Sequence, residues 1–413
     1  MRSRPFVALY IAVFVATMGI SMVSPLLPVY AKELGASGVW LGLTFSAFAV
    51  VQAGFGPFAG RLSDRYGRKP FILLGLVIYM TAALGYLTAN TFYQVIAFRA
   101  FSGFGTSLVF SVARAYVGDM TPRGHEGRWL GVFATADIIG FGTGPLVAGL
   151  LRQTLGFESV FIAMASLLGT SAFILLVWLP RHSPVEARRR AGARPKATSV
   201  SVRTALQDRL VLAVTAHQGL MSLSMGASFS FLALRLEDGL GASPIAIGLA
   251  FATQDLTGGC AQPIFGRLAD RYDRRLLVAI GISVAALFTA FVGFAESYLL
   301  VVLLLFLMGA AGALSQVAAG AVQVVAGRRT GMGTVLGIGS AANGAGIVIG
   351  SIAGGFLVDA YGIGAAFLLG GLIMGAGALV FLGLTRGIST RDSTLSIVPD
   401  SGGMLPEGSA AGP

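Results

Sequence analysis

The sequence has 413 residues, of which 55% are hydrophobic and only 11% are charged. Soluble domains carry about 25% charged residues, so this composition excludes an ordinary soluble protein and indicates a chain surrounded by lipid. The formal net charge is +11, but the basic residues lie in short groups between apolar runs, which argues against nucleic-acid binding. A single cysteine, Cys260, excludes an internal disulfide framework.

Long apolar runs follow one another along the whole chain. A bilayer core of roughly 30 Å needs about 20 apolar residues in a helix. We therefore expect an all-α membrane protein with twelve transmembrane helices. The expected spans are residues 6–30, 39–60, 70–88, 92–118, 129–151, 157–180, 210–236, 244–266, 276–295, 297–325, 333–358 and 362–386. The first run is longer than the core of a cleaved signal peptide, so we expect it to be retained.

Lysine and arginine are distributed unevenly between the two sides of these spans. Of the 29 basic residues, 24 fall in the tails and loops of one side, and only Lys32, Arg152 and Arg235 fall on the other. Positively charged loops stay in the cytoplasm. The distribution predicts an integral protein of the inner or plasma membrane with both termini cytoplasmic.

A basic segment divides the chain into two parts. We expect a six-helix bundle over 1–180, a polar cytoplasmic linker over 181–209, a second six-helix bundle over 210–386 and a disordered cytoplasmic tail over 387–413. The arginines of the linker are placed to contact anionic lipid headgroups, although setting the topology is the simpler role.

The two bundles are related in sequence at a constant offset of 206 residues. Between residues 34 and 69, 15 of 36 positions are identical to those 206 residues later. Because the offset contains six spans, the copies have the same orientation in the membrane. Parallel repeats of this kind place a binding site between the halves and use rocking for access, so a solute transporter is expected.

One motif occurs in both copies, directly after the second and the eighth spans. Residues 60–69 read GRLSDRYGRK and residues 266–275 read GRLADRYDRR. The glycines permit a tight turn, Asp64 can accept hydrogen bonds at a helix N-terminus, and Arg68 can pair with a carboxylate. The motif and its repeat resemble the signature loop of the major facilitator superfamily, and the resemblance covers nearly the whole chain.

This resemblance implies the major facilitator fold, with two parallel six-helix repeats, and a latch that holds the outward-facing state. Asp119 matches the family's usual partner for Arg68, while Asp273 departs from the glycine found at Gly67. A cluster that only fixes topology is the alternative. The residues assigned to the latch are Gly60, Asp64, Arg65, Gly67, Arg68, Asp119, Gly266, Asp270, Arg271 and Arg274.

A second motif lies in the fifth span, where residues 140–149 read GFGTGPLVAG. Gly140 and Gly144 allow close helix approach, and Pro145 frees a backbone carbonyl and permits bending. Together with Gly149, these residues resemble the antiporter motif of the twelve-span drug:proton antiporter branch. The resemblance favours export over uptake, and glycine packing alone is the alternative. Further family patterns are matched by Gly19, Pro25 and Pro28 and by Arg99, Gly103 and Gly105.

Ionisable residues inside the spans are candidate functional residues, because a central charge costs about 2.5–3.5 kcal/mol to insert. Asp137 in the fifth span is our candidate proton carrier, since a carboxylate can change its charge as its contact with water changes. Asn343 is its counterpart in the second copy. Arg99 is placed to alternate as the partner of Asp137 or to orient the substrate.

The other intramembrane candidates are weaker. Asp255, with Ala49 as its counterpart, could bind a cation or a second proton. A permanent structural hydrogen bond is the alternative for both aspartates. His217, beside Gln218, is more typical of a packing residue, and Arg114 lies close enough to a span end to extend outward.

The leading functional hypothesis is proton-coupled efflux of a small lipophilic organic compound or drug by alternating access, with protons, substrate and membrane lipids as partners of a monomer. Transport of a sugar, organic acid or other metabolite is the alternative, and a non-transporting membrane sensor is a third. The sequence shows no paired catalytic carboxylates, metal-spaced His/Cys cluster or phosphate-binding loop. We therefore expect no enzyme, cofactor or metal site.

Overall fold

The structure, a computed structural model, describes residues 4–121, 125–180 and 201–388. The linker expected over 181–209 is described only from residue 201, and the tail from residue 389 lies outside the described residues. Within the described ranges the regular structure is helical. The helices are α1 Arg4–Ser21, α2 Val23–Glu33, α3 Gly38–Tyr66, α4 Arg68–Leu87, α5 Phe92–Met120, α6 Glu126–Trp178, α8 Val202–Ala205, α9 Arg209–Phe229, α10 Leu232–Leu240, α11 Pro244–Arg271, α12 Arg274–Val292, α13 Tyr298–Thr330, α14 Met332–Tyr361 and α15 Ile363–Leu384.

These helices supply the twelve expected crossings. Ten segments of the described chain are long and apolar enough to span a membrane. One of them contains two crossings, because Gly156 interrupts α6 with a φ of 84° that only glycine adopts readily. The twelfth is α11, which is 28 residues long but less apolar than the others and packs against α6 and α13. The chain is thus an all-α integral membrane protein.

The first expected span is broken in the middle. α1 ends at Ser21 and α2 begins at Val23. Proline has no N–H, so Pro25 cannot donate to the carbonyl of Ser21 four residues earlier, and its ring crowds that carbonyl. The equivalent span of the second half is also broken, between α9 and α10, at Ser230 and Phe231.

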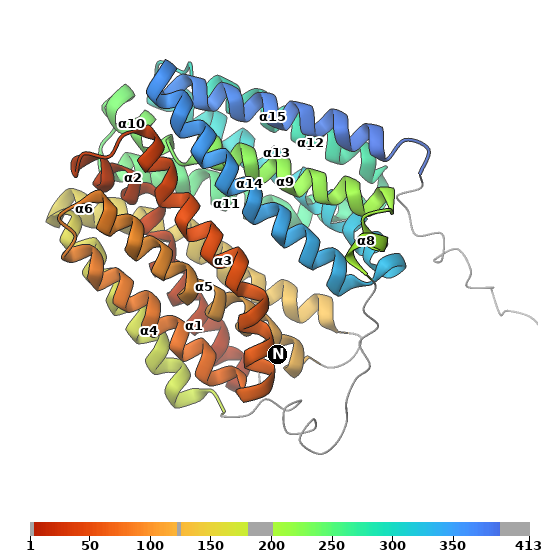
Figure 1. Cartoon of the computed structure of the whole chain (residues 1–413), viewed down its shortest axis with the longest axis horizontal. Coiled ribbons are helices and arrows are strands. Elements are labelled where there is room, and N and C mark those ends of the chain that lie inside the picture. The colour runs from red at the N-terminus through yellow and green to blue at the C-terminus, as the bar shows by residue number, and fades with distance from the viewer. Residues whose placement is uncertain (1–3, 122–124, 181–200, 389–413) are drawn as a thin grey trace, which may run out of the picture.

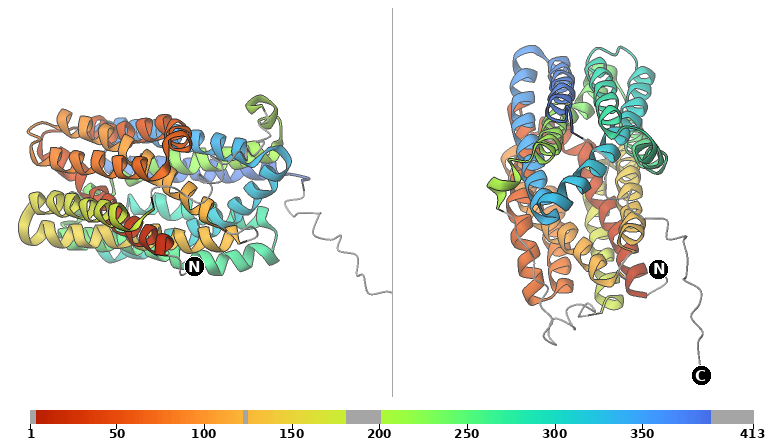
Figure 2. Two further views of the ribbon diagram at one scale, coloured as in Figure 1. Left: turned by 90° about the horizontal axis from the view of Figure 1, so that it is seen from below. Right: turned by 90° about the vertical axis from the view of Figure 1, so that its right-hand side faces the viewer.

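The two halves lie side by side as separate bundles (Figures 1 and 2). We call the end of the molecule that carries Arg4, Gly67 and α8 the linker end, and the end that carries Gly156 and Gly241 the far end. α3 and α14 lie close together near the far end and separate towards the linker end (Figure 1).

The halves meet at the far end through two equivalent helix crossings, α3 with α14 and α6 with α11. At each crossing a glycine of one half lies so close to the other half that a Cβ atom would collide with backbone. Positions 38 and 42 of α3 correspond to 244 and 248 of α11 at the offset of 206. The two crossings are therefore copies of one interface, as parallel repeats require. The four contacts join Gly38 to Gly355, Gly42 to Ser351, Gly149 to Pro244 and Gly248 to Pro145.

The fifth-span motif packs α6 against its neighbours on two sides. Gly140 and Gly144 face α1, and the hydroxyl of Ser21 donates to the carbonyl of Gly140 over 3.1 Å. Pro145, the next residue, and Gly149, five residues after Gly144, face α11 of the other half. The motif thus joins packing inside the first half to the crossing between halves.

This packing generates a stability prediction. A Cβ on Gly144 would collide with Ser21 and with the backbone of Met18, so Gly144→Val should destabilise the protein by about 1–3 kcal/mol. A lower thermal unfolding midpoint in detergent would show this loss. Gly131→Val on the same helix is the matched control, because nothing lies within 4 Å of its Cβ position. Equal midpoints for both variants would contradict the close packing.

Candidate functional site

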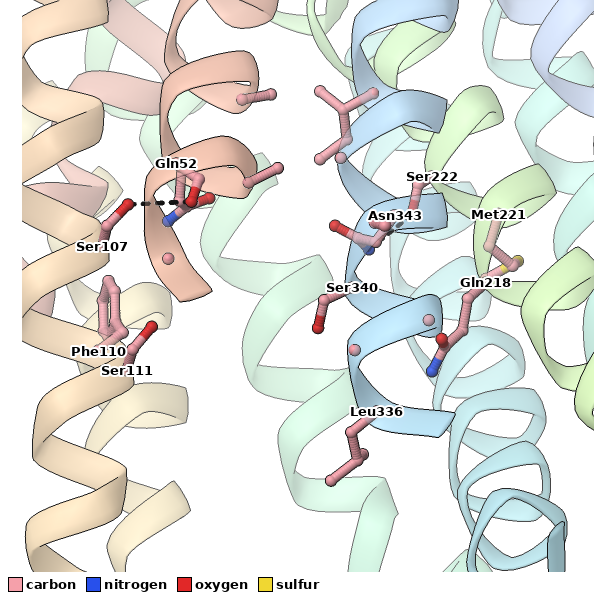
Figure 3. A pocket seen from close by; sticks show the side chains of 18 of the residues that line it. Gln52, Ser107, Phe110, Ser111, Gln218, Met221, Ser222, Leu336, Ser340 and Asn343 are labelled. Carbon is pink, nitrogen blue, oxygen red and sulfur yellow. Dashed lines mark hydrogen bonds between the residues drawn. The ribbon is translucent and has the colours of Figure 1, made fainter. Parts of the chain in front are cut away.

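A cavity of about 950 Å³ lies between the two halves. Its walls come from α3, α5 and α6 of the first half and from α9, α13 and α14 of the second (Figure 3). This is the position that the repeat predicts for a binding site. The volume falls in the range of pockets that hold small organic molecules.

The wall from the first half carries aromatic rings, a charge and the neutral polar side chains of Gln52, Ser107 and Ser111. Phe110 on α5 and Phe141 on α6 both line the cavity and stack with their ring centroids 6.5 Å apart and an interplanar angle of 20°. Arg114, one turn beyond Phe110, also lines it, and its side chain is 65% exposed. It is the one lysine, arginine or carboxylate among the described lining residues.

The wall from the second half carries neutral polar groups, with no lysine, arginine or carboxylate among its described residues. The Asn343 amide donates to Ser222 over 2.6 Å, and Gln218 donates to Gln323 over 3.3 Å. Ser340 and Leu336 lie on the same side (Figure 3). A substrate would therefore meet aromatic rings, a cation and polar groups on one side and further amide and hydroxyl groups on the other.

Asp137 pairs with Arg114. The Arg114 Nη2 atom lies 3.5 Å from Oδ2 of Asp137, and the Thr17 hydroxyl donates to Oδ1 over 3.2 Å. The Asp137 side chain is 14% exposed, so the carboxylate sits just behind the cavity wall. Arg114, which the sequence placed close enough to a span end to extend outward, lines the cavity and contacts Asp137.

Arg99 lies elsewhere and does not pair with Asp137. Its guanidinium carbon is 4.3 Å from the Phe48 ring centroid, and its Nη1 atom lies 3.4 Å from the Tyr79 hydroxyl. The residue is 5% exposed and is buried between α5, α3 and α4 of the first half. Arg99 does not line the cavity, so the structure gives no support for a direct role in orienting substrate there.

Asp255 and His217 occupy different surroundings. Asp255 lies where α11 passes α6 and α13, and the structure gives it no hydrogen bond or ion pair with the described residues. His217 does line the cavity but is only 2% exposed, and its ring centroid lies 5.9 Å from that of Phe381. The neighbouring Gln218 bonds to Gln323 rather than to His217.

The latch residues of the first copy gather at the linker end. Arg68 forms ion pairs with Asp64 at 2.9 Å and with Asp119 at 2.5 Å, so the expected contact with Asp119 is present. Gly67, with a φ of 104°, makes the turn between α3 and α4. Gly60 and Gly266 lie inside helices and make no turn, and Asp64 lies at the C-terminal end of α3 rather than at a helix N-terminus.

Two other latch assignments look different in the structure. The Arg65 guanidinium carbon lies 5.4 Å from the centroid of the Tyr66 ring. In the second copy, Arg274 donates to the Ala269 carbonyl over 3.2 Å. Asp270 and Arg271 lie in the last turn of α11. The sequence reading missed Lys69, which is buried and donates to the carbonyls of Leu176 and Leu179 at the end of α6.

Charged residues that were not singled out from the sequence close the far end. Arg152 donates two hydrogen bonds, of 2.7 and 2.6 Å, to Glu237 across the halves, and Phe157 lies under its guanidinium at 4.4 Å. Lys32 pairs with Asp238 at 2.6 Å. Lys32 and Asp238 are 206 residues apart, so they occupy equivalent positions in the two halves. A bond between equivalent positions lies near the axis that relates the halves.

A carboxylate of one half also caps a helix of the other. Asp359 at the end of α14 accepts hydrogen bonds from the backbone N–H groups of Gly38 and Val39, at 2.7 and 3.0 Å, where α3 begins. In the equivalent place Gln153 accepts from the N–H of Ile245 in α11 over 3.3 Å. Such caps satisfy donors that a helix start leaves unpaired.

The far-end contacts lead to a prediction about opening. Removing one partner of a part-buried, hydrogen-bonded ion pair costs about 2–5 kcal/mol, and each 1.4 kcal/mol changes a population tenfold. Arg152→Gln should therefore open the far end and speed alkylation of a cysteine placed at Ser46, which is 2% exposed and bonds across the halves to Val348. We expect an increase of at least about tenfold in a Cys260→Ser background.

Arg235→Gln is the matched control for this measurement. Arg235 belongs to the same far-end region but donates to the Ala295 carbonyl within its own half. Its removal should leave the alkylation rate unchanged. A rate that rises equally in both variants, or in neither, would show that the Arg152–Glu237 pair does not hold the halves together.

Comparison with known proteins identifies the family. The sequence model described as Major Facilitator Superfamily matches residues 9–234 and 217–396. The multidrug resistance protein MdtG of Enterobacter lignolyticus is 28% identical over 94% of this chain and 93% of its own length. The quinolone resistance protein NorA of Staphylococcus aureus is 27% identical over 65% of this chain and 66% of its own length. The crystal structure of the nucleoside transporter NupG superimposes with a TM-score of 0.75 at 16% identity, covering 94% of this chain and all of that one. The chain belongs to the major facilitator superfamily.

Proposed function

We propose that this protein is a secondary active transporter that exports a small, largely lipophilic organic compound in exchange for protons by alternating access. The observation that carries the proposal is the cavity between two repeats that are joined at one end and carry an ionisable pair, Arg114 and Asp137, at the cavity wall. Transporters of parallel repeats work by rocking one half against the other around such a site.

The charge distribution along the chain supports an assignment of the two ends. The linker end carries the basic loops and the two ends of the described chain, which the positive-inside rule assigns to the cytoplasm of an inner or plasma membrane. With the far end closed by Arg152, Glu237 and Asp359, the cavity would then be accessible from the cytoplasm. This is the state in which an exporter takes up its substrate.

Asp137 has the surroundings that a proton carrier requires. It is part-buried and is bonded to one cation and one hydroxyl. A rearrangement that moves Arg114 or admits water changes the balance between its charged and neutral forms. At the equivalent position the second half has Asn343, which makes a hydrogen bond that needs no ionised group.

The relatives support export of drugs. MdtG is named a multidrug resistance protein and NorA a quinolone resistance protein. The cavity has apolar and neutral polar walls with one cationic side chain, Arg114, and such a lining suits an organic molecule. Transport of a nucleoside, sugar or organic acid is the second candidate, because the amide groups of Gln218, Gln323 and Asn343 could bind hydroxyls and ring nitrogens.

The coupling role of Asp137 can be tested in everted vesicles with an imposed pH gradient, acidic inside. A transported compound should dissipate the gradient, and Asp137→Asn should reduce this dissipation by at least about tenfold, because the amide cannot carry a proton. Glu158→Gln is the matched control, since Glu158 is an exposed carboxylate at the far-end turn of the same helix.

Two results would contradict the proposal in different ways. Unchanged proton coupling in Asp137→Asn would remove this residue from the mechanism while leaving transport intact. Substrate that accumulates in intact cells because of the protein, rather than being depleted from them, would show uptake instead of efflux.

A further inference from the structure

Two side-chain pairs join α5 to α6, one helical turn apart: the aromatic pair of Phe110 and Phe141 and the ion pair of Arg114 and Asp137. Phe110 and Arg114 are four residues apart on α5, and Asp137 and Phe141 are four residues apart on α6. α5 and α6 are antiparallel here, so Phe110 faces Phe141 and Arg114 faces Asp137. Four residues of an α-helix rise about 6 Å, and this is the separation of the two side-chain pairs along the helices.

We propose that the cavity binds aromatic amphiphiles that carry both a carboxylate and an ammonium group, and that these two groups replace the contact between Arg114 and Asp137. The proposal rests on the proposed transport function and names the substrate class of the same site. The aromatic part would pack against Phe110 and Phe141, and the charged groups would lie one turn away.

The geometry of the Arg114–Asp137 ion pair would allow a ligand to replace one residue as the partner of the other. Arg114 contacts Asp137 through a single nitrogen at 3.5 Å, which is longer than an ordinary charge-assisted hydrogen bond. Its side chain is 65% exposed towards the cavity, and a guanidinium has five donors, so it can bind a carboxylate in two places at once. The pair is therefore loosely joined and open to a ligand on the Arg114 side.

Charge balance favours a ligand with both signs. A ligand that has only a carboxylate would take Arg114 and leave Asp137 as an unpaired, part-buried anion, which is costly. A ligand that has only an ammonium group would displace Arg114 from Asp137 and leave the arginine without its partner. A zwitterion supplies a partner to each residue, so neither charge is left uncompensated.

The same arrangement links the substrate to the proton. A protonated Asp137 has no charge to attract an ammonium group, so the proton and the substrate exclude each other at this residue. Mutual exclusion is the requirement for exchange of the two across the membrane.

The test compares three compounds that share a ring and a chain. 2-Naphthylalanine is the zwitterion, 2-(2-naphthyl)ethylamine lacks the carboxylate, and 3-(2-naphthyl)propionic acid lacks the amine. Their dissociation constants for the purified full-length protein are measured by equilibrium dialysis at pH 7.5, with naphthalene fluorescence as the readout. We expect the zwitterion to bind at least about tenfold more tightly than either analogue.

Variants of the two charged residues should abolish this preference separately. Asp137→Asn should bring the zwitterion and the propionic acid to within about twofold, and Arg114→Gln should do the same for the zwitterion and the amine. Glu158→Gln and Arg203→Gln are the controls, since both residues are exposed and neither lines the cavity. A thermal unfolding midpoint within a few degrees of that of the unaltered protein establishes that each variant is folded.

The outcomes separate this inference from the proposed function. Binding of either singly charged analogue as tightly as the zwitterion would overturn the substrate class, even if the protein exports other compounds. A preference for the zwitterion that survives in both variants would show that other residues recognise the charges and would overturn the site. Selective binding without pH-driven movement of the zwitterion in proteoliposomes would contradict the transport function but leave the selectivity standing.

Discussion

The close approach of the two halves at the far end is the constraint on which the rest of the structure depends. Four glycine contacts, in two symmetry-related crossings, bring backbone against backbone without intervening side chains. In a membrane no hydrophobic effect drives helices together, so such contacts depend on small residues and on polar bonds. The caps from Asp359 and Gln153 and the Arg152–Glu237 pair supply those bonds. Because each bond joins one half to the other, all of them must break for the far end to open.

The cavity departs from the symmetry that builds the interface around it. Phe110 and Arg114 correspond to Gln316 and Gly320 in the second half, and all four line the cavity. The repeat therefore accounts for the helices that surround the cavity, while the differences between the halves account for its aromatic and charged side chains. At these equivalent positions, a carboxylate and a guanidinium face each other in the first half only, and we propose that their contact responds to both a proton and a charged ligand.

The sequence was sufficient to predict the architecture, because apolar length, loop charge and the 206-residue offset are properties of the chain itself. The pairing of Arg68 with Asp119 followed from the family resemblance. The pairing of Asp137 with Arg114 could not be predicted from the sequence, because helix packing sets the register of α5 against α6. A signal was nevertheless present: the comparison of halves that marks Asp137 also marks Arg114, whose counterpart is Gly320. The cap from Asp359 has no local signal, since its acceptor and donors are about 320 residues apart.

The central claim is that closing one end of the molecule opens the other. Spin labels at residues 155 and 361 report on the far end, and labels at 66 and 272 report on the linker end; each pair joins exposed, equivalent positions of the two halves. Distances between the labels are measured by pulsed electron paramagnetic resonance in a Cys260→Ser background, with and without Glu237→Gln and Asp359→Asn together. The account predicts that these two substitutions lengthen the far-end distance and shorten the linker-end distance in the same population. A far end that opens while the linker-end distance stays unchanged would contradict it.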